Sequence, residues 1–213
     1  GARDLAAQGI RTIGIPATID NDIACTDYSI GFDTAANTAI DAIDKLADTM
    51  QSHERASIVE VMGRNAGHLA LYVGLASGAA ATLIPEKPVN FESDVIEVIR
   101  EGHYNGKRHS LIIVAEGVGR TNELAEMIKT QTGMETRVTI IGHIQRGGSP
   151  TARDRVMASR MGHFAVKKLI DGASSMVVCY RNSEIVATPI DEALQMKKDL
   201  DGYMYEVAKD IAI

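Results

Sequence analysis

The sequence predicts an α/β protein in which parallel β-sheets are covered by helices on both faces. Short β-branched apolar runs, which are typical of strands, alternate with segments of helical periodicity along nearly the whole chain. With 213 residues the chain can bury a sizeable core, and it shows no internal repeat or low-complexity linker. Any domain boundary must therefore lie within compact structure.

The first half of the chain begins in an expected helix that leads to a short strand at residues 12–15. That strand ends at Pro16, which cannot donate to a sheet ladder. Asp33 or Thr34 can cap a helix that keeps its apolar spacing to about Gln51. Further strands are expected at 56–61, 80–84, 110–115 and 135–141. A helix is expected to follow the loop at 62–67 and to end at residue 77, and two more helices are expected at 93–106, with Ser93 as the cap, and at 122–132.

The last third of the chain opens with a long expected helix at 152–170. Thr151 can cap this helix, and Gly172 ends it. Two strands at 176–180 and 184–187 flank an Asn182-Ser183 turn, and a helix near 203–211 closes the sequence.

Composition excludes several classes of function. Lys plus Arg is 22 against 28 Asp plus Glu, a net charge of −6, which argues against a nucleic acid or a membrane surface as the main partner. Cys25 and Cys179 form no metal-ligand spacing and no disulfide framework, so a reducing cytoplasm fits best. We expect no signal peptide and no spanning helix, and the start without methionine suggests a piece of something longer.

Ionisable side chains follow four of the expected strands. They are Asp20 and Asp22 after the first strand, Arg64 after the second, Glu116 after the fourth, and His143 with Arg146 after the fifth. If the strands are parallel and adjacent, both signs of charge converge on one edge of the sheet. Arginine beside glycine-opened backbone suits a phosphate, whereas carboxylates there bind a metal or take a proton from a hydroxyl. The pattern predicts phosphoryl transfer to or from a sugar-like alcohol.

Each of these signals also has an ordinary structural interpretation. The segment 20–22 could form an Asx-rich turn, and Arg64 or Arg137 could be a surface or ion-pair residue. The run 147–149 could be a flexible turn before a capped helix, although a helix N-terminus also attracts anions. The run 153–155 is expected to be a charged first turn.

Three segments carry a resemblance to a known family. Pro16-Ala17-Thr18-Ile19-Asp20-Asn21-Asp22, Met62-Gly63-Arg64 and Gly142-His143-Ile144-Gln145-Arg146-Gly147-Gly148-Ser149-Pro150 closely resemble, in order, the signatures of bacterial ATP-dependent 6-phosphofructokinases. The resemblance covers nearly the whole chain. It implies a phosphofructokinase fold of two similar, interleaved three-layer α/β/α domains. Residues 1–31 and 144–194 would belong to the nucleotide-side domain, and 32–143 and 195–213 to the sugar-phosphate-side domain.

The resemblance implies a cytoplasmic glycolytic kinase that uses Mg²⁺. Such an enzyme transfers the γ-phosphoryl group of ATP to the 1-hydroxyl of fructose 6-phosphate. By resemblance Asp20 is the catalytic base that accepts the proton of this hydroxyl, and Thr18 touches the transferring phosphoryl region. Asp22 would help the magnesium site, and Arg64 looks like the arginine that steadies the transferred phosphoryl group.

The resemblance also implies the remaining substrate contacts. They are Ile19 in the first motif, Met62 and Gly63 beside the sugar, Glu116 on its hydroxyls, and His143, Ile144, Gln145 and Arg146 in the third motif. Of these, His143 and Arg146 resemble ligands of the 6-phosphate. Arg55 and Arg137 match positions that reach the 6-phosphate from a neighbouring subunit, which implies a homotetramer with shared sites.

Two departures from the family pattern stand out. The family's Gly-Gly-Asp-Gly nucleotide loop precedes the stretch that begins here, as do its early glycine-rich loop and an arginine on the phosphates, so we expect these 213 residues to be inactive alone. Ala47 and Ala80 stand where the family's allosteric site has an arginine and an acidic residue. Lys107 and Arg108 still resemble the basic part of that effector site, which leaves activation by ADP open.

Two rival functions remain. Pyrophosphate-dependent relatives typically carry lysine directly before the Thr-Ile-Asp-Asn-Asp run, and Ala17 at that position favours ATP. A noncatalytic sugar-phosphate-binding subunit would keep the arginines but gain nothing from Asp20 near a phosphate. An upstream Gly-Gly-Asp-Gly would support ATP, and Gly-Gly-Asp-Asp would support pyrophosphate.

Overall fold

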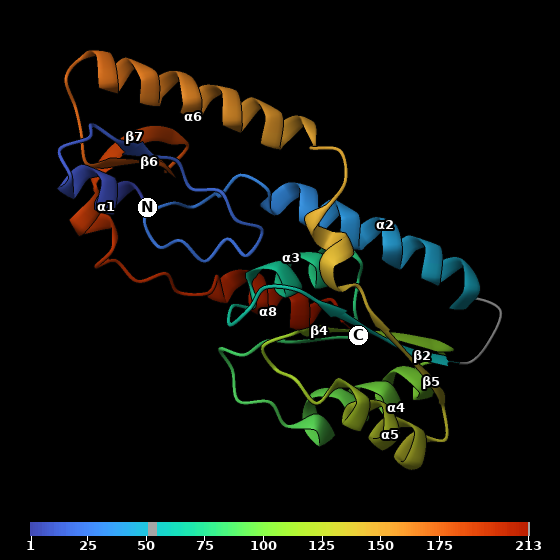
Figure 1. Ribbon diagram of the computed structural model, residues 1–213. Helices are drawn as coiled ribbons and strands as arrows, with labels where there is room; N and C mark the ends of the chain where they lie inside the picture. The colour runs from blue at the N-terminus through green and yellow to red at the C-terminus, as the bar shows by residue number, and fades with distance from the viewer. Residues whose placement is uncertain (51–54, 213) are drawn as a thin grey trace. The chain divides into compact units, whose positions relative to one another are not determined.

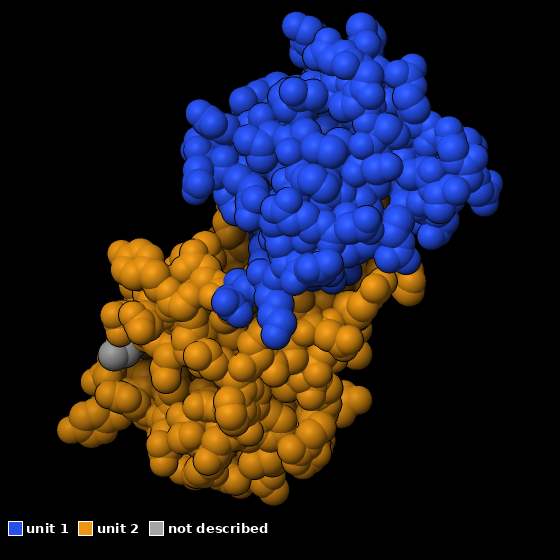
Figure 2. Space-filling view, turned by 90° about the vertical axis from the view of Figure 1, so that its left-hand side faces the viewer, with its two compact units in different colours: residues 1–34, 149–199 blue, residues 35–148, 200–213 orange. Residues whose placement is uncertain are grey.

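The chain divides into two compact units (Figure 2). Each unit combines a sheet with helices. A computed structural model describes residues 1–50 and 55–212. Unit 1 comprises residues 1–34 and 149–199, and unit 2 comprises residues 35–148 and 200–213. This confirms the predicted α/β class. The expected nucleotide-side and sugar-side domains, 1–31 with 144–194 and 32–143 with 195–213, stay predictions.

Unit 2 is built on a four-stranded sheet in which every strand pair is parallel (Figure 1). Its strands are β2 (Arg55–Val61), β3 (Ala81–Leu83), β4 (His109–Ala115) and β5 (Glu135–Ile140), in the order β3-β4-β2-β5. The two central strands, β4 and β2, are almost continuously buried and apolar, as expected for strands covered on both faces. The four strands lie where the sequence predicts them, to within one residue at each end.

Helices cover both faces of this sheet. They are α2 (Phe32–Met50), which begins in unit 1, α3 (His68–Ala76), α4 (Glu97–Tyr104), α5 (Thr121–Thr132) and α8 (Gly202–Asp210). Figure 1 shows α4 and α5 on one face, and α3 with α8 on the other. Fully buried aliphatic side chains, among them Ile58, Ile99 and Ile112, form the core between the sheet and α4 and α5.

Two segments of unit 2 differ from the prediction. The helix expected from Ser93 consists of a π-helical turn, η1 (Glu92–Ile96), followed by α4, and the Asn90 side chain accepts a hydrogen bond from the Glu92 N–H at 3.1 Å. A segment expected as loop forms a 3₁₀ helix, η2 (Gly142–Arg146). The expected end of α2 near Gln51 lies outside the described residues.

Unit 1 contains a three-stranded sheet in the order β1-β6-β7. Strand β1 (Ile13–Gly14) pairs in parallel with β6 (Met176–Arg181), and β6 pairs in antiparallel fashion with β7 (Glu184–Pro189). The predicted Asn182-Ser183 turn joins β6 and β7, with φ of 49° and 67°, which is the left-handed geometry of a tight hairpin. Strand β1 is shorter and less buried than predicted, because it is an edge strand with β6 as its pairing partner.

The helices of unit 1 are α1 (Ala2–Ala7), α6 (Ala152–Ile170) and α7 (Ile190–Ala193). The predicted cap of α6 is confirmed, because the Thr151 hydroxyl accepts a hydrogen bond from the Asp154 N–H at 3.2 Å. The short helix α7 has no counterpart in the prediction. Among the described residues of both units, none of the helices has the length and apolar character needed to cross a membrane.

Candidate active site

The carboxyl ends of the strands in unit 2 meet at one edge of its sheet, because all the strand pairs are parallel. The segment Met62–Arg64 follows β2 directly, Glu116 follows β4, and Gln145 lies in η2 after β5. Since β2 lies between β4 and β5, the Met62–Arg64 segment is flanked by Glu116 on one side and Gln145 on the other. The structure thus brings two of the predicted motif segments together with Glu116.

Glu116 fixes the backbone of this segment. Its Oε1 atom accepts hydrogen bonds from the N–H of Gly63 at 3.2 Å and of Arg64 at 2.6 Å. Gly63 has a φ of 143°, and a Cβ there would lie 2.5 Å from the Ala66 carbonyl oxygen, so the turn requires glycine. Oε2 of Glu116 makes no hydrogen bond within the described chain. One carboxylate oxygen therefore supports the loop and the other can receive a ligand hydroxyl.

Gln145 supports the same segment from the other side. Its side chain is 1% exposed, and its Oε1 atom accepts a hydrogen bond from the Met62 N–H at 2.7 Å. Its Nε2 atom is buried without a hydrogen-bond partner among the residues described. The neighbouring His143 and Arg146 are exposed, so η2 turns one polar side chain inward and presents the others to solution. A direct substrate contact for Gln145 stays a prediction.

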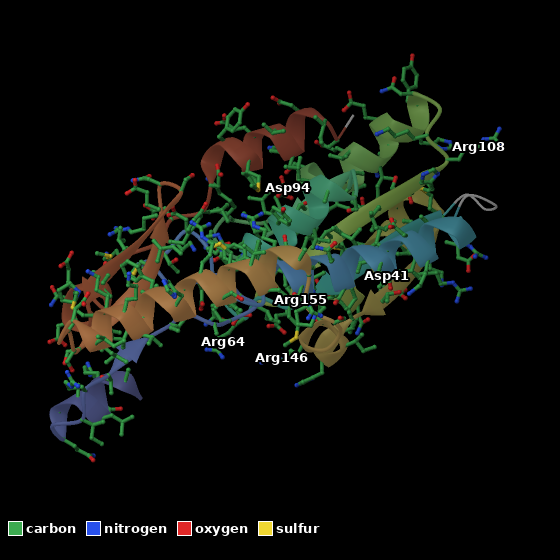
Figure 3. The ribbon with its side chains drawn as sticks, turned by 90° about the horizontal axis from the view of Figure 1, so that it is seen from above. Asp41, Arg64, Asp94, Arg108, Arg146 and Arg155 are labelled. Atoms are coloured by element: carbon green, nitrogen blue, oxygen red, sulfur yellow. The ribbon has the colours of Figure 1, made fainter. Side chains whose placement is uncertain are left out.

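The loop side chains Arg64 and Arg146 lie far from the predicted effector residues. Figure 3 shows Arg108 well away from Arg64 and Arg146. The topology explains this separation, because Arg108 immediately precedes β4, whereas Arg64 and Arg146 follow the ends of β2 and β5. Lys107 and Arg108 line one surface pocket together with Ala47 and Ala80, and Lys107 Nζ donates to the Ala212 carbonyl at 2.9 Å.

Arg55 and Arg137 are joined by an acidic residue that the sequence analysis missed. Glu135 Oε2 accepts a hydrogen bond from Arg55 Nε at 2.8 Å, and its Oε1 lies 2.5 Å from an Arg137 guanidinium nitrogen. The hydrogen bond from Arg55 holds the pKa of Glu135 below its usual value. Arg55 starts the seven-residue β2, so about 20 Å of strand separates it from Met62. Arg55 therefore lies apart from the carboxyl-edge cluster of its own unit, and Glu135 joins Arg137 to it.

The first predicted motif belongs to unit 1, where a turn at Asn21 shapes its loop. Asn21 has a φ of 51°, its Oδ1 accepts from the Ser29 N–H at 3.0 Å, and its Nδ2 donates to the Asp27 carbonyl at 3.3 Å. Thr18 Oγ1 accepts from the Asp20 N–H at 3.2 Å. Asp20 is 4% exposed. The Asx-turn interpretation thus describes Asn21, whereas Asp20 is a buried carboxyl.

The end of this loop is anchored to β6 in unit 1. Thr26 Oγ1 accepts a hydrogen bond from the Tyr180 N–H at 2.9 Å, and the Asp27 N–H donates to the Tyr180 carbonyl at 2.8 Å. Beside these contacts, the buried thiols of Cys25 and Cys179 belong to one small apolar cluster, and their interaction raises the pKa of Cys25 and lowers the pKa of Cys179 to about 7. The sequence analysis did not predict that these two cysteines lie together.

The predicted site residues are divided between the two units. Thr18, Ile19, Asp20 and Asp22 lie in unit 1, and the other predicted site residues lie in unit 2. Asp22 is exposed. Within the described ranges, no three His, Cys, Asp or Glu side chains are grouped so that they could hold a metal ion.

Glu86 is a second acidic residue that the sequence analysis missed. It follows β3, and its Oε1 accepts a hydrogen bond from the Gly67 N–H at 2.7 Å. Its place after a strand end was the signal that could have found it, whereas nothing in the sequence pointed to Glu135.

Fold and site together define a class of protein: an α/β protein with charged, glycine-opened loops at the carboxyl edge of a parallel sheet. Comparison with known proteins makes the class specific. The profile of the family described as Phosphofructokinase matches residues 1–169. The chain belongs to the phosphofructokinase family, which confirms the resemblance seen in its motifs.

Individual relatives agree with this assignment. The chain is 56% identical over 211 residues to ATP-dependent 6-phosphofructokinase 1 of Clostridium perfringens, and the match covers 99% of this chain and 66% of that protein. It therefore spans just under two thirds of the length of this relative. The phosphofructokinase structure from Saccharomyces cerevisiae superposes with a TM-score of 0.84 at 29% identity, over 99% of this chain and 31% of that one.

A pyrophosphate-dependent phosphofructokinase from Marinobacter aquaeolei shares the fold as well. It superposes with a TM-score of 0.79 at 23% identity, covering 100% of this chain and 63% of that chain. Since both kinds of phosphofructokinase share the architecture, the fold alone does not identify the phosphoryl donor.

Proposed function

We propose that the complete protein is an ATP-dependent 6-phosphofructokinase, a glycolytic kinase that phosphorylates the 1-hydroxyl of fructose 6-phosphate. The observation that supports this most strongly is the 56% identity to a relative of that name. Asp20 and Arg64 lie in the segments that resemble the family motifs, and Glu116 resembles the residue that holds the sugar hydroxyls.

In the proposed reaction Asp20 acts as general base. Its carboxylate accepts the proton of the sugar 1-hydroxyl while that oxygen forms a bond to the γ-phosphorus and the bond from phosphorus to ADP breaks. Arg64 steadies the negative charge on the transferred group, and Thr18 contacts the same region. When bound, Mg²⁺ neutralises phosphate charge; Asp22, an exposed carboxylate, together with the nucleotide phosphates, would hold it.

The sugar phosphate would be held mainly by unit 2. Glu116 Oε2 is available to the sugar hydroxyls, because its Oε1 is already engaged by the loop backbone. His143 and Arg146 are exposed candidates for the 6-phosphate, and a charge-assisted contact such as that of Arg146 is typically worth ~1.5–3 kcal/mol. Met62 and Gly63 would line the sugar, with Ile19, Ile144 and Gln145 as the remaining contacts.

Arg55 and Arg137 are proposed to bind the 6-phosphate of a neighbouring subunit in a homotetramer. The position of Arg55 supports this assignment, because it lies about 20 Å along β2 from the carboxyl-edge cluster of its own unit, and Arg137 is tied to it through Glu135. Glu135 would hold both guanidinium groups in place until the phosphate of the neighbouring subunit's substrate competes for them.

Two further assignments complete the proposal. The pocket that contains Lys107 and Arg108 would bind an anionic effector, with activation by ADP left open by Ala47 and Ala80. The protein would work in the cytoplasm, where both of its cysteines stay reduced.

Two rival functions are less well supported. For a pyrophosphate-dependent enzyme, a cation is expected next to Thr18, and Ala17 occupies that position. For a noncatalytic sugar-phosphate-binding subunit, a carboxyl at Asp20 would bring no benefit.

The acceptor specificity tests the proposal. The complete protein is incubated with Mg²⁺-ATP and one sugar phosphate at a time, either fructose 6-phosphate, fructose 1-phosphate or glucose 6-phosphate, and ADP release is measured. We expect rapid release with fructose 6-phosphate alone, because its 1-hydroxyl is free and its 6-phosphate suits His143 and Arg146. Equal rates with glucose 6-phosphate, or ADP release independent of the sugar, would contradict the proposal.

A further inference from the structure

Asp154 is a buried carboxylate that the sequence analysis assigned to a charged first turn of α6. The structure confirms its place in the first turn and shows in addition that Asp154 is 2% exposed, whereas the side chain of its neighbour Arg153 is 55% exposed. A carboxylate this deeply buried needs strong partners to offset its lost hydration. Its position in the first turn of the 19-residue helix α6 stabilises the charged carboxylate, since helix N-termini favour negative charge, but this effect alone does not offset the hydration lost on burial.

Four hydrogen-bond donors surround the carboxylate. Oδ1 accepts from the Tyr28 hydroxyl and from the Gly31 N–H at 2.8 Å. Oδ2 accepts from the hydroxyl of Thr34 and from its N–H at 2.9 Å. All four donors belong to one stretch of seven residues, 28–34, which joins the end of the Asp20 loop to the start of α2. Gly31 has a φ of 107°, which lets its N–H reach the carboxylate.

The charge states of Asp154 and Tyr28 keep this arrangement intact at neutral pH. Burial raises the pKa of Asp154, but the hydrogen bonds from Thr34, Tyr28 and Gly31 outweigh burial and bring its pKa below the usual value. Burial, together with the adjacent Asp154 carboxylate, raises the pKa of Tyr28 far above neutrality. Asp154 therefore stays an acceptor and Tyr28 stays a donor.

A second set of hydrogen bonds connects this stretch to the residues around Asp20. Ser29, between Tyr28 and Gly31, donates its hydroxyl to the Thr18 carbonyl at 2.7 Å and its N–H to Asn21 Oδ1 at 3.0 Å. The Ile30 N–H donates to the Pro16 carbonyl at 3.2 Å. The two halves of the loop are thus bonded to each other. Asp20 lies in one half, and Asp154 holds the other half on α6.

We propose that Asp154 is a positioning residue for Asp20: it fixes residues 28–31 on α6, and Ser29 passes that constraint to Thr18 and Asn21 on either side of the base. The proposal rests on the assigned role of Asp20 as general base. A base must lie within hydrogen-bond reach of its proton, and a displacement of about 1 Å can cost ~10²-fold in rate.

Asp154→Asn is the sharpest variant, because it keeps the shape of the side chain and removes the second acceptor. Whichever way the amide turns, its NH₂ group faces either the Gly31 N–H or the Thr34 N–H. Tyr28→Phe is the milder companion, which removes a single hydrogen bond to Oδ1. Asp201→Ala is the control, because Asp201 caps a helix of the other unit, α8. In that cap, Asp201 Oδ1 accepts a hydrogen bond from the Met204 N–H at 2.9 Å.

In the complete protein we expect Asp154→Asn to lower kcat by about 10- to 100-fold while the KM for fructose 6-phosphate changes less than about threefold. Tyr28→Phe should lower kcat by a smaller factor, and Asp201→Ala should lower the Tm without changing kcat. Amide hydrogen exchange of residues 17–31 should speed up in Asp154→Asn and Tyr28→Phe but not in Asp201→Ala.

Exchange is measured without substrate, so it separates this proposal from the proposed function. A parent protein without kinase activity would overturn the function, and the exchange rates would still report whether Asp154 holds the loop. Unchanged exchange of 17–31 in Asp154→Asn would overturn the proposal, and so would a kcat within about twofold of the parent. If Asp154→Asn does not fold, Tyr28→Phe decides by the same criteria.

Discussion

Replacing Asp20 with serine in the complete protein should lower kcat by about 10²- to 10⁴-fold and leave the affinity for fructose 6-phosphate nearly unchanged. This range is the usual contribution of a general base. The carboxyl is 4% exposed, so a smaller serine fits the space without a clash. Initial rates of ADP release give kcat, and calorimetric titration with fructose 6-phosphate gives the affinity.

Asp41→Ser is the matched control for Asp20→Ser. Asp41 is an exposed aspartate on α2 that pairs with Lys45 four residues later, and such surface pairs contribute little to stability. Its kcat should equal that of the parent protein. A kcat for Asp20→Ser within a few-fold of the parent would show that the proton is taken by another group.

Replacing Glu116 with alanine should lower kcat/KM for fructose 6-phosphate by about 10²- to 10⁴-fold. The change removes the acceptor for the N–H groups of Gly63 and Arg64 as well as the oxygen available to the sugar. Hydrogen bonds to a charged group contribute ~1.5–3 kcal/mol each, so the loss of two corresponds to about this factor. Both kcat and KM should change, because the loop that carries Arg64 loses its support.

Glu123→Ala is the control for Glu116→Ala. Glu123 is exposed on α5, and its side chain pairs with Arg120. We expect its kinetics to match those of the parent. If Glu116→Ala changes KM alone, Glu116 contacts the sugar but does not hold Arg64 in place; unchanged kinetics would remove Glu116 from the site.

Most of the fold could be predicted from sequence, because its strongest signals are local. Apolar runs of five to seven residues located β2 and β4, and the Thr151 cap located the start of α6. The prediction failed where tertiary contacts decide the structure. Strand β1 is short because it is an edge strand, and the turn before α4 is π-helical although nothing in its composition predicts that.

The candidate site was predictable to the extent that it consists of strand ends and recognisable motifs. Its supporting interactions were not, because they join residues far apart in the chain. Asp154 contacts residues about 120 positions earlier, and Glu135 pairs with Arg55 across neighbouring strands. Gln145 belongs to a motif, yet its burial under Met62 follows from the strand order rather than from the motif.

The choice of phosphoryl donor tests the central claim most directly. The complete protein is given fructose 6-phosphate with equimolar Mg²⁺-ATP and Mg²⁺-pyrophosphate, and the reaction is followed by phosphorus NMR. We expect fructose 1,6-bisphosphate and ADP to appear together while pyrophosphate stays constant, in keeping with Ala17 beside Thr18. Loss of pyrophosphate with ATP unchanged, or no new phosphate ester on the sugar, would contradict the account.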